Sequence, residues 1–205
     1  RDRYRFALIR LAEEKLEENE PEKAFSLLKS SLTYPENLGE GKLPNVPDNE
    51  AFYFMGKACR MMGQEEESVK YFRLAASGSQ EPSSVLYYND QPSDYIYYQG
   101  LAYRELGEEN AAKKSFHQLI TYGEKHLFDK VSYDFFAVSL PEIEVFQDDL
   151  PLRNTQYCRY LRALGAAGLG EKEKAVSLLK EILGKQNDHF KAEAFLRELK
   201  YRKSL

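Results

Sequence analysis

Three stretches of this sequence repeat one pattern: an apolar-periodic segment, a glycine, a charged segment that contains glutamate and a second apolar-periodic segment. The glycines are Gly63, Gly107 and Gly170, and the stretches begin near Phe52, Ile96 and Arg159. Glycine adopts the left-handed conformation that ends a helix without a Cβ penalty. The glutamates that follow favour a helix N-terminus, where free backbone N–H groups attract negative charge. The pattern therefore predicts pairs of helices joined by tight turns.

Apolar residues recur three or four positions apart within each stretch, as the buried face of a helix requires. A weaker stretch precedes the three, with a turn at residues 19–21 and the apolar residues Leu8, Leu11, Ala12, Ala24, Leu27 and Leu28. We therefore predict an all-α fold of four helix pairs, in residues 5–35, 49–78, 93–126 and 153–186. A closing helix over residues 188–201 is expected to bury Phe190, Ala194 and Leu199.

The spacing of the glycines predicts long connectors between the helix pairs. Gly56 and Gly100 are 44 residues apart, and Gly107 and Gly170 are 63 residues apart. The additional residues fall at 33–49, 77–93 and 123–152, and each of these segments contains proline, glycine, asparagine or aspartate turn signals. Connectors of this length are uncommon in compact domains and are often functional.

The residues around two of the turns match, at most positions, one order: a bulky residue, leucine and glycine, an aromatic, the turn glycine, a small residue, an aromatic and another small residue. The matching residues are Phe52, Met55, Gly56, Cys59, Gly63, Ser68, Phe72 and Ala75, and then Gly100, Tyr103, Gly107, Ala112 and Phe116. This order resembles the tetratricopeptide repeat. The resemblance implies a single domain over residues 1–205, a right-handed α-α superhelix whose concave groove binds a protein partner. Gln99 and Arg162 stand where the repeat has leucine, so we expect their helices to pack imperfectly.

Four further strings, in residues 86–92, 97–102, 122–129 and 135–141, resemble the C-terminal repeat region of a group of large bacterial proteins. Those proteins carry the domain of unknown function 5107, a sugar-mutarotase-like β region that precedes the repeats. The resemblance implies a carbohydrate-related context but brings no catalytic residue to this chain. Because the chain starts at Arg1 with no initiator methionine, we also expect it to be part of a longer protein.

The composition is that of an ordinary soluble globular protein, with 42% hydrophobic and 30% charged residues. A net charge of −4 argues against a nucleic-acid partner, because binding to phosphate backbones usually requires a basic excess. No apolar run approaches the length of a membrane span. Cys59 and Cys158 have neither a disulfide framework nor a CxxC spacing, which fits two core residues in a reducing, cytoplasmic compartment.

Catalytic and metal-binding patterns are sparse. None of the three histidines, His117, His126 and His189, stands in an HExxH arrangement or beside a cysteine. His126 and Asp129 offer two ligands where a zinc site needs at least three. One connector contains the acids Glu142, Glu144, Asp148 and Asp149, but nothing in the sequence predicts the raised pKa that a catalytic acid requires. We therefore predict no catalytic residue, no metal and no cofactor, and do not expect an enzyme.

The concave groove is the better candidate for a functional site. In tetratricopeptide proteins the first helix of each pair lines this groove, and the positions that face it hold Tyr53, Phe54, Lys57, Arg60, Tyr97, Tyr98, Leu101, Arg104 and Tyr157. Tyrosine and arginine dominate binding hot spots because each combines contact area with a polar end. The alternative is that Tyr53 and Tyr97 only pack between adjacent helices.

One tetratricopeptide function can be tested residue by residue. Chaperone-binding members hold a C-terminal carboxylate with lysine, asparagine and arginine side chains, and the matching positions here are Ile9, Glu13, Phe54, Asp94 and Tyr98. Because Glu13 and Asp94 would repel a carboxylate, we do not expect a chaperone-tail clamp.

The connectors supply a second candidate site, formed by Tyr87, Tyr88, Asn89 and Asp90. Aromatic rings beside short polar side chains suit sugar or peptide recognition, although the same residues also form ordinary turns. Three functions stay open. We favour a non-catalytic scaffold that binds a peptide or a neighbouring domain. The alternatives are an accessory domain of a carbohydrate-active or carbohydrate-binding bacterial protein, and a structural spacer or dimerisation unit.

Overall fold

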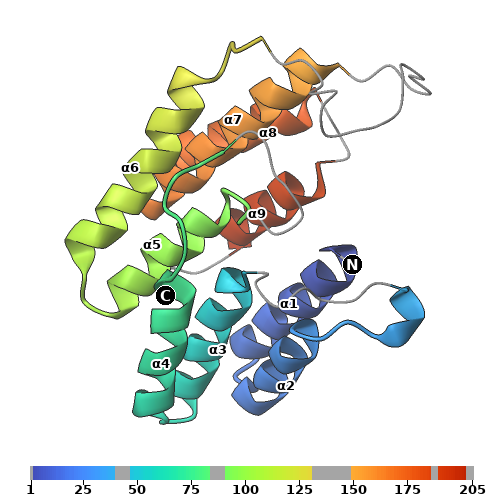
Figure 1. Ribbon diagram of the computed structural model, residues 1–205, viewed down its shortest axis with the longest axis vertical. Helices are drawn as coiled ribbons and strands as arrows, with labels where there is room; N and C mark the ends of the chain where they lie inside the picture. Colours follow the sequence, from blue (N-terminus) through green and yellow to red (C-terminus); the bar gives the residue numbers. More distant parts are fainter. Residues whose placement is uncertain (1, 40–46, 84–90, 131–148, 186–188, 202–205) are drawn as a thin grey trace. The chain divides into compact units, whose positions relative to one another are not determined.

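The computed structural model describes the whole chain except residues 1, 40–46, 84–90, 131–148, 186–188 and 202–205 (Figure 1). The described residues form nine α-helices and one short 3-10 helix, η1 (Glu36–Leu38), and contain no β-strand. The α-helices are α1 (Asp2–Glu17), α2 (Pro21–Ser31), α3 (Asn49–Met61), α4 (Glu65–Ala76), α5 (Tyr95–Glu105), α6 (Glu109–Lys125), α7 (Leu150–Gly168), α8 (Lys172–Leu183) and α9 (Phe190–Tyr201). The all-α prediction is confirmed for this part of the chain.

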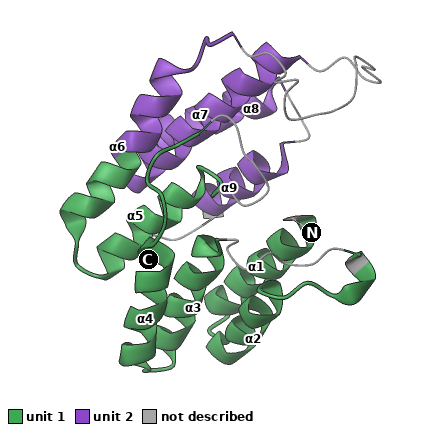
Figure 2. Cartoon of the chain, in the orientation of Figure 1, with its two compact units in different colours: residues 1–116 green, residues 117–205 purple. Residues whose placement is uncertain are grey.

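Helices that follow one another in the sequence pack against one another. The chain divides into two compact units, residues 1–116 and residues 117–205 (Figure 2), and α6 begins in the first unit and ends in the second. In the first unit α1, α2, α3, α4 and α5 pack in sequence, and α3 also contacts α1 and α5 directly. In the second unit α7 packs on α8, and α8 packs on α9. This sequential pairing is consistent with a helical repeat.

One residue in the left-handed conformation ends the first helix of each of four pairs. The four residues have φ angles of 58°, 73°, 79° and 84°, and they are Asn19, Gly63, Gly107 and Gly170. The N–H of the following residue then donates to a carbonyl five residues earlier, as Gln64 does to Cys59 at 2.9 Å and Glu20 does to Lys15 at 2.8 Å. This is the Schellman arrangement, which bonds carbonyls that the helix end would otherwise leave free. Asparagine serves the first turn because it tolerates this conformation better than most residues.

A small residue seven positions before each turn is matched by a bulky residue nine positions after it. The four combinations are Ala12 with Leu28, Gly56 with Phe72, Gly100 with Phe116, and Ala163 with Leu179. All eight residues are buried. A Cβ atom added to Gly56 would lie 2.6 Å from Cε1 of Phe72, and the corresponding atom at Gly100 would lie closer still to Phe116. The small residue is therefore glycine in the pairs whose bulky residue is phenylalanine, and alanine in the pairs whose bulky residue is leucine.

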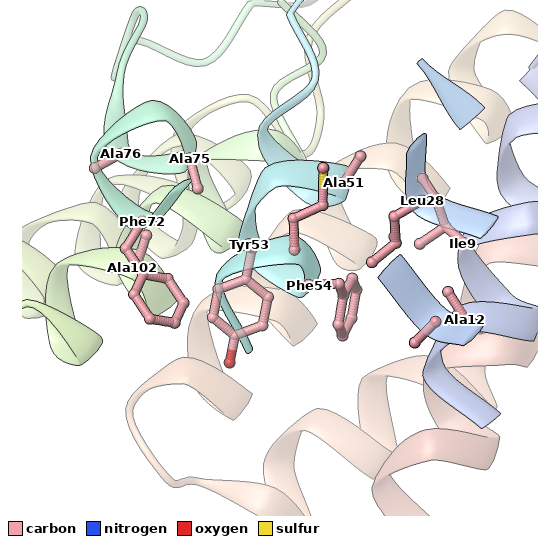
Figure 3. Close-up of a cluster of buried hydrophobic side chains, with 12 residues drawn as sticks. Ile9, Ala12, Leu28, Ala51, Tyr53, Phe54, Phe72, Ala75, Ala76 and Ala102 are labelled. Atoms are coloured by element: carbon pink, nitrogen blue, oxygen red, sulfur yellow. The ribbon is translucent and has the colours of Figure 1, made fainter. Parts of the chain in front are cut away.

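Figure 3 shows how these contacts join into one core in the first unit. The rings of Tyr53 and Phe54 lie between Phe72 on one side and Ala12 and Leu28 on the other. All five side chains come from consecutive helix pairs, so the core continues from each pair into the next.

A buried ion pair fixes the end of the first connector. Arg5 in α1 and Asp48, directly before α3, are both buried, and Nη2 of Arg5 lies 2.5 Å from Oδ1 of Asp48. Burial alone would lower the pKa of Arg5, but Tyr95, Asp48 and Tyr34 raise it above its ordinary value, so the guanidinium stays charged. A buried charge without a partner would cost several kcal/mol, so the pair fixes the position of Asp48 against α1.

Two expectations about apolar faces were wrong. In α9 the buried residues are Ala192, Phe195 and Leu196, whereas Phe190 is 41% exposed. The other two expected residues, Ala194 and Leu199, are half-buried. Apolar residues thus lie on more than one side of α9, and the sequence pattern alone could not choose between the faces. In α1, Leu11 is 46% exposed rather than buried.

Gln99 in α5 stands where the tetratricopeptide repeat has leucine, and the expected imperfect packing is found only in part. Gln99 is completely buried, and its side-chain amide donates to the carbonyl of Ser77 at 2.7 Å, just beyond the end of α4. Its Oε1 atom has no hydrogen-bond partner in the described structure, and such an atom costs free energy when buried. The helix therefore packs closely, but with one unbonded polar atom.

Replacing Gly56 by alanine is expected to lower the free energy of unfolding by about 1–3 kcal/mol, because the new methyl group would overlap the ring of Phe72. Adding Phe72→Leu to Gly56→Ala recreates the combination found at Ala12 and Leu28. The double variant should therefore be less destabilised than the sum of the two single variants. Urea denaturation followed by circular dichroism measures all three, and strictly additive losses would show that the contact does not set the helix spacing.

Candidate binding surface

The predicted groove residues of α3 recur in α5 at the same distances from the turn glycine. Tyr53 corresponds to Tyr97, Phe54 to Tyr98, Lys57 to Leu101, and Arg60 to Arg104. Because corresponding positions lie on the same side of their helices, and α3 contacts α5 directly, these residues share one surface of the first unit, the first-helix face. Tyr157 lies half-buried on α7 in the second unit and is considered apart from this surface.

The first tyrosine of each helix is a packing residue. Tyr53 and Tyr97 are each 6% exposed. The ring centroid of Tyr53 lies 5.9 Å from that of Phe72, and the centroid of Tyr97 lies 5.9 Å from that of Phe116. Phe54 is also buried, at 1% exposed. These three side chains form the buried layer under the first-helix face and expose almost no area to a ligand.

Tyr98 is the half-buried aromatic residue at the centre of the first-helix face. Its ring centroid lies 6.1 Å from that of Tyr53, 6.0 Å from that of Phe54 and 5.4 Å from that of Tyr97. Its hydroxyl donates to Oε1 of Glu50 at 2.7 Å. The ring therefore rests on three buried aromatic residues, while its polar end is fixed by a carboxylate of the neighbouring helix.

Glu50 also joins α3 to α1. Its Oε1 atom accepts a hydrogen bond from Nη2 of Arg10, whose other terminal nitrogen lies 2.6 Å from Glu13. The Arg10 guanidinium lies 5.3 Å from the ring centroid of Phe6 and 5.7 Å from that of Phe54, within the range of a cation–π contact. Arg10, Glu50 and Tyr98 thus form a chain of polar contacts across three helices.

Phe6 and Arg10 are not among the site residues predicted from the sequence, whereas the tetratricopeptide groove positions do include Glu50 of α3. A signal for them existed, because Arg10 stands at the same distance before Asn19 as Phe54 before Gly63 and Tyr98 before Gly107. Phe6 and Glu50 correspond in the same way. Recognising Asn19 as the equivalent of a turn glycine would have aligned the first pair and placed Phe6 and Arg10 on the first-helix face as well.

The two arginines of the first-helix face lie over buried phenylalanines. The guanidinium of Arg60 lies 4.8 Å from the ring centroid of Phe72, and that of Arg104 lies 5.2 Å from the centroid of Phe116. Arg60 forms an ion pair with Glu105 of α5, and Arg104 lies 3.4 Å from Glu109. Their side chains are still 37% and 42% exposed. The ring and the carboxylate orient each guanidinium at the edge of the surface.

Among the described residues, His126, His189 and Asp149 each make a structural contact. His126 pairs with Asp129 at 2.6 Å, and His189 accepts the N–H of Ala192 at the start of α9. Asp149 caps α7 by accepting the N–H of Leu152. Within the described part of the chain, no group of three or more histidine, cysteine, aspartate or glutamate residues could hold a metal ion.

Both cysteines are buried free thiols, as expected for core residues. Burial raises the pKa of Cys59, and burial together with the nearby Asp129 raises the pKa of Cys158 to about 11, although Arg162 opposes this shift. A thiol that keeps its proton is a poor nucleophile and a poor metal ligand. Neither cysteine is therefore arranged for chemistry.

The second candidate site cannot be placed. Tyr87, Tyr88, Asn89 and Asp90 lie outside the described residues, as do Glu142, Glu144 and Asp148. The carbohydrate-related function that the connector residues suggested therefore stays a prediction.

No protein-family model matches the chain. The tetratricopeptide resemblance therefore rests on the sequence order and on the repeated turn geometry. No helix among the described residues is long and apolar enough to span a membrane.

The pKa of Cys158 predicts a loss of stability at high pH. The unfolded chain releases this proton near the ordinary value of 9.0, whereas the folded protein holds it to about pH 11. The stabilising contribution is therefore complete below pH 9 and disappears as the pH rises through this range. Between pH 8 and pH 11 the wild type should lose more unfolding free energy than Cys158→Ala, which keeps Cys59 and every tyrosine. Parallel pH profiles for the two proteins would contradict the assignment.

The bond between Tyr98 and Glu50 can be tested by removing only the hydroxyl group. Tyr98→Phe is expected to lower the free energy of unfolding by about 1 kcal/mol, because the Glu50 carboxylate loses a donor in a half-buried place. Tyr4→Phe is the matched control, since the Tyr4 hydroxyl has no hydrogen-bond partner in the described structure. Equal effects of the two substitutions in thermal denaturation would show that the bond does not contribute to stability.

Proposed function

We propose that this chain is a non-catalytic protein-interaction module that binds a peptide segment on the first-helix face of α3 and α5. The proposal is supported most directly by the polar chain of Arg10, Glu50 and Tyr98. These contacts hold a half-buried tyrosine in one orientation before any partner arrives, and such pre-organisation reduces the entropy lost on binding.

The composition of the surrounding surface supports the same function. Leu101 and Lys57 are half-buried next to the two oriented arginines, and Met61 is 41% exposed in the last turn of α3. Tyrosine, methionine and arginine are enriched at protein interfaces, and arginine and tyrosine are frequent among the residues that dominate binding energy. The surface combines these types with both signs of charge, which suits a mixed polar and apolar peptide.

In this proposal the helix pairs are of the tetratricopeptide type and form a right-handed superhelix whose concave side includes the first-helix face. The identical offsets of small and bulky residues around the four turns support this assignment. The pairs differ from the standard repeat in their longer connectors, which bring the spacing from Gly56 to Gly100 to 44 residues.

Selection from a displayed library of random peptides tests the proposal even though the natural partner is unidentified. Enriched peptides should bind the wild type and bind about tenfold or more weakly to a Leu101→Glu, Arg104→Glu double variant, since both changes oppose contacts on the first-helix face. The control is a Lys113→Glu, Lys114→Glu double variant, which changes exposed residues of α6. Thermal denaturation of each protein confirms that it is folded.

Two results would contradict the proposal. In the first, the library yields no enriched sequence. In the second, the enriched peptides bind the variant of Leu101 and Arg104 as tightly as they bind the control variant, which would place their site elsewhere on the protein.

A further inference from the structure

The first helix pair has an apolar side that is only partly covered. Leu8 and Leu27 are half-buried, and Leu11 is 46% exposed. We call these three residues the leucine face. Measured from their turns, they correspond to Phe52, Met55 and Tyr71 in the second pair.

The corresponding residues of the second pair receive the helix α2. The ring of Phe25 in α2 lies edge-on to Tyr71, with 5.7 Å between centroids, and Tyr71 in turn stacks on Phe52 at 6.3 Å. Met55, the equivalent of Leu11, is only 2% exposed, and α2 packs on α3. In the second pair this side is therefore an interface for the second helix of the pair before it.

The third pair uses the same side in the same way. Ile96 and Gln99 correspond to Leu8 and Leu11, and both are completely buried. Gln99 donates to the carbonyl of Ser77, directly after α4, and α4 packs on α5. An established interface thus occurs at two successive pairs, and the leucine face is its equivalent on the first.

The exposure of Leu11 is not by itself evidence of a binding surface, because a second leucine is equally exposed. Leu74 in α4 is also 46% exposed. Its equivalents in the other pairs are the polar residues Ser30, Gln118 and Glu181, so its position belongs to ordinary surface. Single exposed leucines are common and need no partner, whereas the equivalents of Leu11 in the second and third pairs are buried against another helix.

The charge beside the leucine face indicates what kind of helix would fit. Glu14 is exposed, whereas its equivalents Ala58 and Ala102 are completely buried. Glu14 forms no ion pair with any other described residue. A basic side chain on an incoming helix would meet this carboxylate at the edge of the contact, where complementary charge favours association.

We propose that the leucine face docks an amphipathic helix of another polypeptide. The helix carries an aromatic or aliphatic anchor at the place that Phe25 occupies against Tyr71, and a lysine or arginine directed toward Glu14. A second copy of this chain fits less well. The second helices α2, α4 and α8 already pack on the helices that follow them, so none of these three is available in a second copy. The leucine face is a different surface from the first-helix face, so this inference does not rest on the proposed function.

The helix α2 supplies a probe, because it is the occupant of the equivalent interface. The probe is a fluorescent peptide of residues 20–34, held helical by a hydrocarbon staple between positions 26 and 30, since so short a helix is marginal in water. Ser26 and Ser30 are exposed in α2, so the staple should not enter the contact. The matched control peptide carries Phe25→Ala. Binding to the full chain is measured by fluorescence anisotropy.

We expect saturable binding of the Phe25 peptide, with about tenfold weaker binding of the Phe25→Ala peptide, because the substitution removes the apolar ring that makes the contact. Leu11→Glu in the protein should weaken binding by a similar factor or more, whereas Leu74→Glu, at a position of equal exposure, should leave it unchanged. Equal denaturation temperatures of the two protein variants exclude unfolding as the cause.

Three outcomes would overturn the proposal. The Phe25 peptide does not bind, or Leu11→Glu and Leu74→Glu weaken its binding equally. Alternatively, sedimentation shows that the wild type self-associates and that Leu11→Glu, but not Leu74→Glu, abolishes this association. The last result would assign the leucine face to a second copy of the chain.

Discussion

Each helix pair in this protein combines a small buried residue of its first helix with a bulky buried residue of its second, and in two pairs the two residues are shown in close contact. Where the bulky residue is Phe72 or Phe116, the small residue is glycine, and where it is Leu28 or Leu179 the small residue is alanine. The distance between two packed helices depends on the side chains at their contact. Between the two helices of a pair, glycine leaves room for an aromatic ring, whereas alanine leaves room for a leucine side chain. In the pair of α3 and α4 and the pair of α5 and α6, this contact and the left-handed turn residue together fix the geometry.

The side chains that join one pair to the next are less uniform than those within a pair. Phe52, Met55 and Tyr71 present an aromatic and aliphatic face to α2, whereas the equivalent side of α5 includes Gln99, which bonds the backbone after α4. Apolar contact and a hydrogen bond to a backbone carbonyl are two ways to complete the same interface, because a buried polar group is tolerated when it finds a partner. The first pair has leucines at the corresponding places, and this observation carries the docking proposal.

Much of the candidate site follows from positions relative to the turns, but the role of each residue there does not. Tyr53 and Tyr97 occupy the same position and both are packing residues, whereas Phe54 and Tyr98 occupy one position and differ in burial. Tyr98 is oriented by Glu50, and Glu50 by Arg10, which belongs to another helix pair. Such contacts join residues 40 or more positions apart. A periodicity of three or four residues contains no information about contacts at that distance.

The sequence by itself determined that the described chain is helical and where its turns lie, because turn glycines and apolar periodicity act over a few residues. Tertiary structure decided which of two apolar stripes α9 buries, that Leu11 is exposed although Met55 is not, and that Arg10, Glu50 and Tyr98 meet. Burial depends on which helix lies opposite a face, and a single helix does not encode its neighbour. The local rules therefore specify each helix pair, and the surface on which a partner would bind arises only where the pairs pack together.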